Sequence, residues 1–187
     1  TIGDSNTVIG YGALAQHTTG SRNIAIGASS LGATQAGGTQ GNSAASVDNV
    51  AIGYGAMGGN WANESSNRSV AIGNYAMGNA MNTANDDTAV GHNALNDITL
   101  ANDCAAFGSG AGSAITEGNN NTCIGVNAGN TITTGGNNTC IGNNSDVSAT
   151  NAEKRISIGV VGSNASADST IYIGDNSNYL SYGYGGG

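Results

Sequence analysis

The sequence predicts an all-β fold, a parallel β-solenoid (β-roll) of about ten coils of 17 residues each. Three observations lead to this prediction. A pattern N-[TV]-[AC]-I-G-x-x-A-[LMG] recurs along the chain, its glycines follow one another in several consecutive steps of 17 residues, and Gly is abundant at 32 of 187 residues. A short repeat that cannot bury its own apolar residues is typical of solenoids, in which each coil rests on the next.

The first element of each coil is a strand. Segments such as Val50-Ala51-Ile52 are rich in β-branched residues and predict strands of four or five residues. A helix is excluded because Gly every few residues would cost about 1 kcal/mol each in a helix interior. We expect the anchor glycine after each strand to adopt a positive φ where a Cβ would clash. These structural turn glycines are Gly10, Gly27, Gly53, Gly73, Gly91, Gly108, Gly125, Gly142, Gly159 and Gly174.

The second element is an apolar ladder on the strands. Strand side chains alternate between faces, so the columns one and three residues before the anchor glycine share a face, and both are β-branched or bulky. We expect them to be buried. The structural core ladder one residue before the glycine is Ile9, Ile26, Ile52, Ile72, Val90, Phe107, Ile124, Ile141, Ile158 and Ile173.

The rest of the coil is predicted to be a second short strand and a polar loop. The column between the two bulky ones is mostly Ala, Cys or Ser. Since small side chains let backbones approach closely, we expect this column to pack against neighbouring chains in a parallel, intertwined homotrimer. A monomer in which the Ala column fills its own narrow interior is the alternative.

The solenoid domain is expected to span residues 1–178, with insertions at 32–48 and 59–68 and a Tyr/Gly-rich tail at 179–187. In a rod, binding residues are expected where the repeat is interrupted. Trp61, the only Trp, stands in the second insertion beside Asn60 and Asn63, and Tyr54 precedes them. We take these four residues as candidates for a carbohydrate-stacking surface, while Trp61 folding back over the roll is equally compatible with the sequence.

The composition argues against several classes of function. The chain has twelve acidic and four basic residues, for a net charge of −8. A nucleic-acid partner would need clustered Lys and Arg. There is no run of 18 apolar residues, so no membrane insertion is expected. With two histidines and no recognisable catalytic or calcium-binding motif, we expect no enzyme activity, no cofactor and no metal.

The three cysteines leave alternatives open. Cys123 and Cys140 fill the small column in adjacent coils, and Cys104 precedes them. They act either as small buried residues or, at a strand spacing near 4.8 Å, as partners in a disulfide between coils or between chains.

Two segments carry a resemblance to known families. Residues 49–58 (Asn-Val-Ala-Ile-Gly-Tyr-Gly-Ala-Met-Gly) and 69–78 (Ser-Val-Ala-Ile-Gly-Asn-Tyr-Ala-Met-Gly) resemble the head repeat of YadA-like trimeric autotransporter adhesins. Asn-Asn-Thr-Cys-Ile-Gly preceded by Thr-Thr-Gly is similar to phage and large-virus tail-fibre repeats. The resemblance implies a left-handed, trimeric β-roll on a virion or cell surface, with attachment as its role.

We therefore expect an extracellular or virion-surface fibre segment that binds a glycan or protein receptor. The alternative is a bacterial trimeric adhesin head. A third possibility is an ice-binding solenoid, because Thr7, Thr88, Thr122 and Thr139 align. We set ice binding last because Ile24, Val50 and Val70 share that column, which the sequence indicates is buried.

Overall fold

The computed structural model describes residues 3–15, 19–32, 45–59, 65–159, 168–175 and 177–183. Within these ranges, eleven strands form one sheet. In chain order they are β1 (Thr7–Ile9), β2 (Ile24–Ile26), β3 (Val50–Ile52), β4 (Val70–Ile72), β5 (Thr88–Val90), β6 (Ala105–Phe107), β7 (Thr122–Ile124), β8 (Thr139–Ile141), β9 (Ile156–Gly159), β10 (Thr170–Gly174) and β11 (Tyr179–Gly183).

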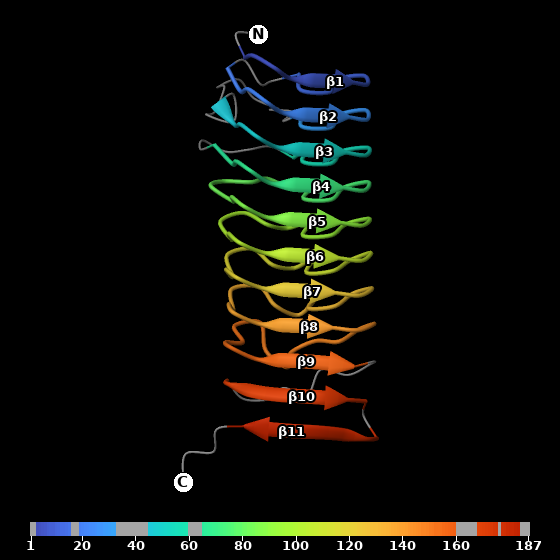
Figure 1. The fold of residues 1–187 in the computed structure, drawn as a ribbon, viewed down its shortest axis with the longest axis vertical. Helices are drawn as coiled ribbons and strands as arrows, with labels where there is room; N and C mark the ends of the chain where they lie inside the picture. The colour runs from blue at the N-terminus through green and yellow to red at the C-terminus, as the bar shows by residue number, and fades with distance from the viewer. Residues whose placement is uncertain are drawn as a thin grey trace.

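The strands stack in chain order along the long axis of the molecule (Figure 1). β1 to β10 are parallel, and equivalent residues of the repeat lie opposite one another. Thus Ile124 pairs with Ile141, and Ile141 with Ile158. The stack is a β-solenoid of about eight turns, which confirms the prediction of an all-β parallel solenoid whose repeats form ladders.

The orientation of the strands is the reverse of what we expected. The small middle column points into the solenoid, and the bulky columns point outward. Ala51, Ala89 and Cys140 are fully buried, whereas Phe107 and Ile124 are 43% and 40% exposed. The expected core ladder is therefore in register but lies on the outer surface of this chain, and the monomer-type packing, with Ala inside, is the one that the structure shows.

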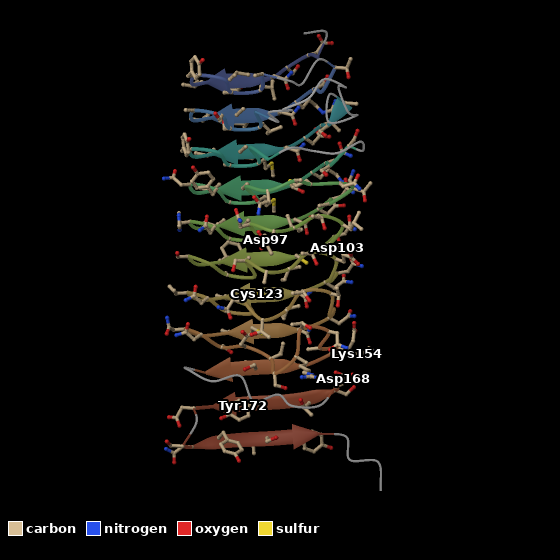
Figure 2. All side chains as sticks on the ribbon, turned by 180° about the vertical axis from the view of Figure 1, so that it is seen from behind. Asp97, Asp103, Cys123, Lys154, Asp168 and Tyr172 are labelled. Carbon is tan, nitrogen blue, oxygen red and sulfur yellow. The ribbon has the colours of Figure 1, made fainter. Side chains whose placement is uncertain are left out.

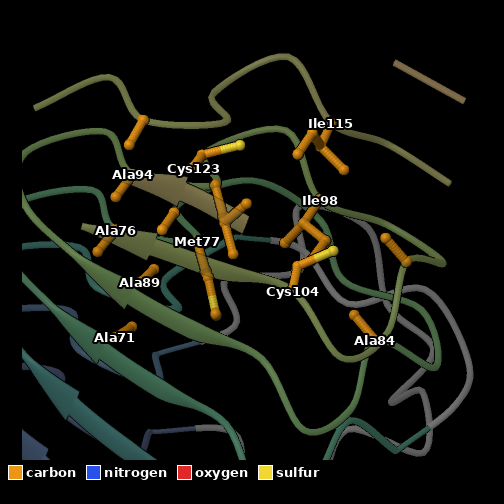
Figure 3. Packing of buried hydrophobic residues seen from close by; sticks show 14 of the residues in the cluster. Ala71, Ala76, Met77, Ala84, Ala89, Ala94, Ile98, Cys104, Ile115 and Cys123 are labelled. Carbon is orange, nitrogen blue, oxygen red and sulfur yellow. The ribbon is translucent and has the colours of Figure 1, made fainter. Parts of the chain in front are cut away.

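The reason for this orientation is the narrowness of the coil. The chain folds back over the strand so closely that only Ala, Cys or Ser fits the inward position of most strands. The remaining interior volume is filled from the turn that follows. Four residues after the anchor glycine, Leu31, Met57, Met77 and Leu95 are all fully buried. Figure 3 shows Met77 beside the Ala column and Ile98 and Ile115 beyond it.

The core changes composition between Leu95 and Gly112. At Gly112 and Gly129 the column that held Leu or Met holds Gly, and Cys123 and Cys140 replace Ala on the strands. The Sγ of Cys123 occupies the freed space and would clash with a Cβ on Gly129. Ile98, Ile115 and Ile132 complete this half of the core. Interior volume is thus conserved between two different residue pairs, as dense packing requires.

The anchor glycines allow the coils to approach closely. Gly125, for example, has φ of +132°, and a Cβ on it would clash with the carbonyl oxygen of Gly142 in the next coil. The backbone beyond the anchor also turns at alternate residues: Asn93 and Leu95 have φ of 55° and 47°. Left-handed residues in alternation prevent an extended chain. This is why most coils contain one strand of three residues rather than the two strands that we expected.

A ladder of buried amides fixes the register from inside. The side chains stand four residues before the anchor glycine, and Asn138 illustrates the pattern. Its Oδ1 accepts the N–H of Arg155 in the next coil at 3.0 Å, its Nδ2 donates to the carbonyl of Ala152 at 2.7 Å, and its N–H donates to Oδ1 of Asn121 at 3.0 Å. One amide thus satisfies backbone groups of neighbouring coils that would otherwise be buried without partners.

Both predicted insertions fall largely outside the described residues, which include only 45–48 and 65–68 of their later parts. After each insertion the ladder resumes in place: the N–H of Asp48 donates to the carbonyl of Ser21, and that of Arg68 to the carbonyl of Val47. Of the tail, Tyr179–Gly183 forms β11, which pairs antiparallel with β10. Tyr179 stacks on Tyr172 with ring centroids 4.9 Å apart.

Candidate functional site

An extended apolar surface lies on the outward side of the parallel sheet, and we call it the sheet face. It consists of the columns one and three residues before the anchor glycines. Every residue in it is Ile, Val, Phe, Thr or Ala, and none is charged. Ile9, Ile72 and Ile173 are 61%, 38% and 43% exposed. The sequence identified these residues as a ladder but placed them in the core.

Of the four predicted binding residues, Tyr54 alone falls within the described ranges, and Trp61, Asn60 and Asn63 lie outside them. Tyr54 lies on the corner ridge, our name for the residues one and two positions after each anchor glycine. Here the chain leaves the strand, and the ridge runs from coil to coil along the rod.

Tyr54 is part of an aromatic pair. Its ring centroid lies 5.2 Å from that of Tyr75 in the next coil, and the rings are nearly perpendicular at 87°. Hydrogen bonding with Tyr54 raises the pKa of the Tyr75 phenol above its ordinary value. The Tyr75 phenol is thus neutral at physiological pH. The sequence did not single out Tyr75, which stands one position further along its coil than Tyr54.

A polar hollow of about 410 Å³ begins one coil beyond Tyr75. It is lined by His92, Asn93, Ser109, Asn127, Asp97 and Ser113, among others. His92 was interpreted from sequence as an exposed coil residue, and it is exposed. Its position after an anchor glycine was the one available signal that it shares a surface with Tyr54. That a hollow lies beside it could not be predicted, because Asn96, Asp97 and Ser113 reach it from the far side of the turn.

Asp87 is an unusual acid of the interior. It occupies a rung of the amide ladder and is fully buried. Its Oδ1 accepts the N–H of Cys104 at 2.9 Å, and its Oδ2 has no hydrogen-bond partner among the described residues. Burial raises the pKa of Asp87 to about 8. Figure 2 labels the neighbouring Asp103 and, further along the stack of strands, Cys123.

The three cysteines are free, buried thiols, so the structure shows no disulfide between coils. Burial raises the pKa of Cys104 to about 12. Hydrogen bonding with Cys140, followed by burial, raises the pKa of Cys123 well above its ordinary value. The nucleophile is the thiolate, so these thiols have the properties of structural rather than reactive cysteines.

Charged side chains line one corner of the rod, on the left-handed residue five positions before the anchor glycine. Arg22 pairs with Asp48 at 2.5 Å, and Arg68 pairs with Asp86 at 2.6 Å. These pairs are exposed, and such pairs contribute little to stability. Arg155 differs, because its side chain is 7% exposed while its partner Asp168 is at the surface.

In the described ranges, no three His, Cys, Asp or Glu side chains gather as a metal site would require. Nor does any helix there have the length and apolarity to span a bilayer. Comparison of the chain with protein families, with curated proteins and with solved structures gave no match.

Proposed function

We propose that this chain is a structural segment of a viral or phage fibre that serves in attachment to a cell surface, and that three parallel copies assemble through the sheet face. The sheet face is the observation that carries the proposal. It is a continuous, uncharged, apolar strip that runs along ten parallel strands. Exposed strips of this kind mark interaction surfaces in soluble proteins.

The energetic argument follows from the exposure of the ladder. Complete burial of an exposed Val, Ile or Phe side chain is worth roughly 1.5–3 kcal/mol. The ladder residues are already half-buried, so each gains about half of that, and ten of them gain on the order of 10 kcal/mol. A gain of this size is sufficient to offset the usual entropic cost of association.

The proposed assembly and the assembly suggested by the sequence place different residue columns at the contact between chains. The small residues already fill the interior of each coil, so the bulky columns form the contact between chains. A left-handed, trimeric β-roll is the arrangement that the adhesin and tail-fibre resemblance implies. A bacterial adhesin head, the alternative, would use the same contact and differ only in where the rod is displayed.

The test is the mass of the protein in solution by light scattering after gel filtration. We expect three times 18.2 kDa. The variant Ile124→Asp places a charge on the sheet face and should yield monomers, whereas Asn130→Asp places the same charge at an exposed site away from it. Circular dichroism checks that both variants keep their β structure. A mass of one chain for the unmodified protein would overturn the proposal.

Attachment is tested separately with fluorescent protein on intact bacterial and eukaryotic cells. Three linked copies bind a surface more tightly than one copy because the later contacts are intramolecular. We therefore expect the unmodified protein to stain one cell class at least tenfold more strongly than Ile124→Asp, with Asn130→Asp unchanged. Equal staining by all three proteins, or none, would contradict an attachment role.

Ice binding remains a second candidate because of one observation. The column that contains Thr7, Thr88, Thr122 and Thr139 lies on the outward sheet face, so the reason for regarding it as buried was wrong. A single chain would then present a regular Thr and Ile surface to water. Thermal hysteresis in a monomeric preparation would support this candidate, and a trimer without hysteresis would exclude it.

A further inference from the structure

We infer that the corner ridge from Tyr54 to Asn127 binds a neutral oligosaccharide, with the Tyr54–Tyr75 pair as a stacking platform and the adjoining polar hollow as the subsite for sugar hydroxyls. The inference rests on the proposed attachment function and adds to it a location on the rod and a class of ligand. Four observations support it.

The first observation is a held but open aromatic surface. Tyr75 is 43% exposed and Tyr54 51%, and the two rings lie edge to face against each other. A Cβ on Gly55 would come within 3.0 Å of the Tyr75 ring, so the absence of a side chain there lets the ring lie against the preceding coil. The backbone N–H of Tyr54 donates to Oδ1 of Asn74 at 3.1 Å. Rings held in this way offer apolar area at low entropic cost, and the C–H face of a pyranose can pack on them.

The second observation is continuity between the platform and the hollow. The backbone N–H of Tyr75 donates to the carbonyl of Tyr54, that of Asn93 to the carbonyl of Asn74, and that of Gly110 to the carbonyl of His92. Successive coils therefore carry Tyr54, Tyr75, Asn93 and Gly110 side by side along the ridge. A linear oligosaccharide lying along the ridge would meet the rings first and the polar groups next.

The third observation is unused hydrogen-bonding capacity. No hydrogen bond from any described residue reaches the His92 imidazole or the Asn93 carboxamide. Asp97 is positioned by Asn79 and Asn96, both of which donate to its Oδ1, and its Oδ2 is left for a ligand. Sugar hydroxyls both donate and accept, and amide, imidazole and carboxylate groups provide both kinds of partner.

The fourth observation concerns charge. The chain carries a net charge of −8, and Asp97 lines the hollow while no Lys or Arg does. An anionic sugar would be repelled by this field without any cation to compensate. The ligand class is therefore a neutral oligosaccharide rather than a sialylated or sulfated one.

The experiment measures binding of the intact protein to immobilised maltohexaose, cellohexaose, chitohexaose and N-acetyllactosamine, with 3′-sialyllactose and a heparin hexasaccharide as anionic probes. Tyr75→Asn and His92→Ala place on the ridge residue types that other coils already carry there, as Asn93 and Ala28 show. Tyr11→Ala removes a more exposed ridge tyrosine away from the hollow, at 90% exposure, and is the control. Solution mass and melting temperature confirm that each variant keeps its assembly and fold.

We expect binding to at least one neutral probe, a loss of tenfold or more in both Tyr75→Asn and His92→Ala, and a change of less than twofold in Tyr11→Ala. The inference is overturned if no neutral probe binds, if anionic probes bind more tightly, or if the ridge variants bind as well as the unmodified protein. Cell staining that persists in these cases would leave the attachment function standing. A single-chain mass without cell staining would instead contradict the proposed function.

Discussion

Replacement of Asp87 by Asn should make this protein more stable at neutral and alkaline pH, because Asp87 is an acid in a place built for an amide. At the equivalent position of another coil, Nδ2 of Asn121 donates to the carbonyls of Gly118 and Gly135, each at 2.9 Å. A protonated carboxyl can imitate such a donor, whereas a carboxylate cannot. Ionised Asp87 would therefore be a buried charge without a donor at Oδ2.

The magnitude follows from the pKa. Burial, together with the nearby Asp103 and Asp86 and against the opposing N–H of Cys104, raises the pKa of Asp87 from 3.8 to about 8. Between pH 4 and pH 8 the folded chain holds a proton that the unfolded chain lacks, so stability falls as the pH rises. A tenfold difference in proton affinity between the folded and unfolded chains is worth about 1.4 kcal/mol. The loss is therefore about 4 kcal/mol by pH 7 and at most about 6 kcal/mol above pH 8.

The assay is urea unfolding followed by circular dichroism at pH 5, 7 and 8.5. For Asp87→Asn we expect the free energy of unfolding to lose most of this decline with pH and to exceed that of the unmodified protein by a few kcal/mol at pH 8.5. Asp86→Asn is the control. The adjacent Asp86 is exposed, and hydrogen bonding to Arg68 lowers its pKa, so its replacement should leave the decline in place. Parallel pH profiles for the unmodified protein and Asp87→Asn would refute the reasoning.

Three further predictions concern packing and the thiols. Gly129→Ala should destabilise the chain by about 1–3 kcal/mol through overpacking against Cys123. Addition of Cys123→Ala should recover part of the loss in a double-mutant cycle measured by urea unfolding, and additivity of the two changes would contradict direct contact. Gly125→Ala should abolish cooperative melting, because its φ of +132° and the carbonyl of Gly142 exclude a Cβ. Gly12→Ala, with φ of +67° and no atom closer than 3.9 Å to the added Cβ, should cost only about 1 kcal/mol, and similar melting curves for the two variants would contradict this account of the anchor glycines. The three thiols should resist a maleimide at pH 8 until urea unfolds the chain, because all three are buried and the pKa values of Cys104 and Cys123 are raised. Rapid labelling of the folded protein would contradict that burial.

The spacing of the glycines was enough to predict the solenoid, its parallel strands and the ladder register. This is because a fixed repeat allows only one neighbour for each residue once the coils stack. Ile124, Ile141 and Ile158 pair as their spacing required. The tertiary structure decided which face of the strand is inside. The rule that bulky residues are buried favoured the Ile columns, but local turn geometry overrode it.

The physical reason lies in the residues after the glycine. Left-handed backbone at positions such as Asn93 and Leu95 bends the chain back over the strand. On most strands this leaves room only for Ala, Cys or Ser, and Leu or Met enters the interior from the turn. Sequence alone does not show these dihedral angles in residues other than Gly. The candidate site follows the same division. Tyr54 and His92 could be aligned by their columns, but the pairing with Tyr75 and the hollow beside Asp97 exist only because the coil closes so tightly.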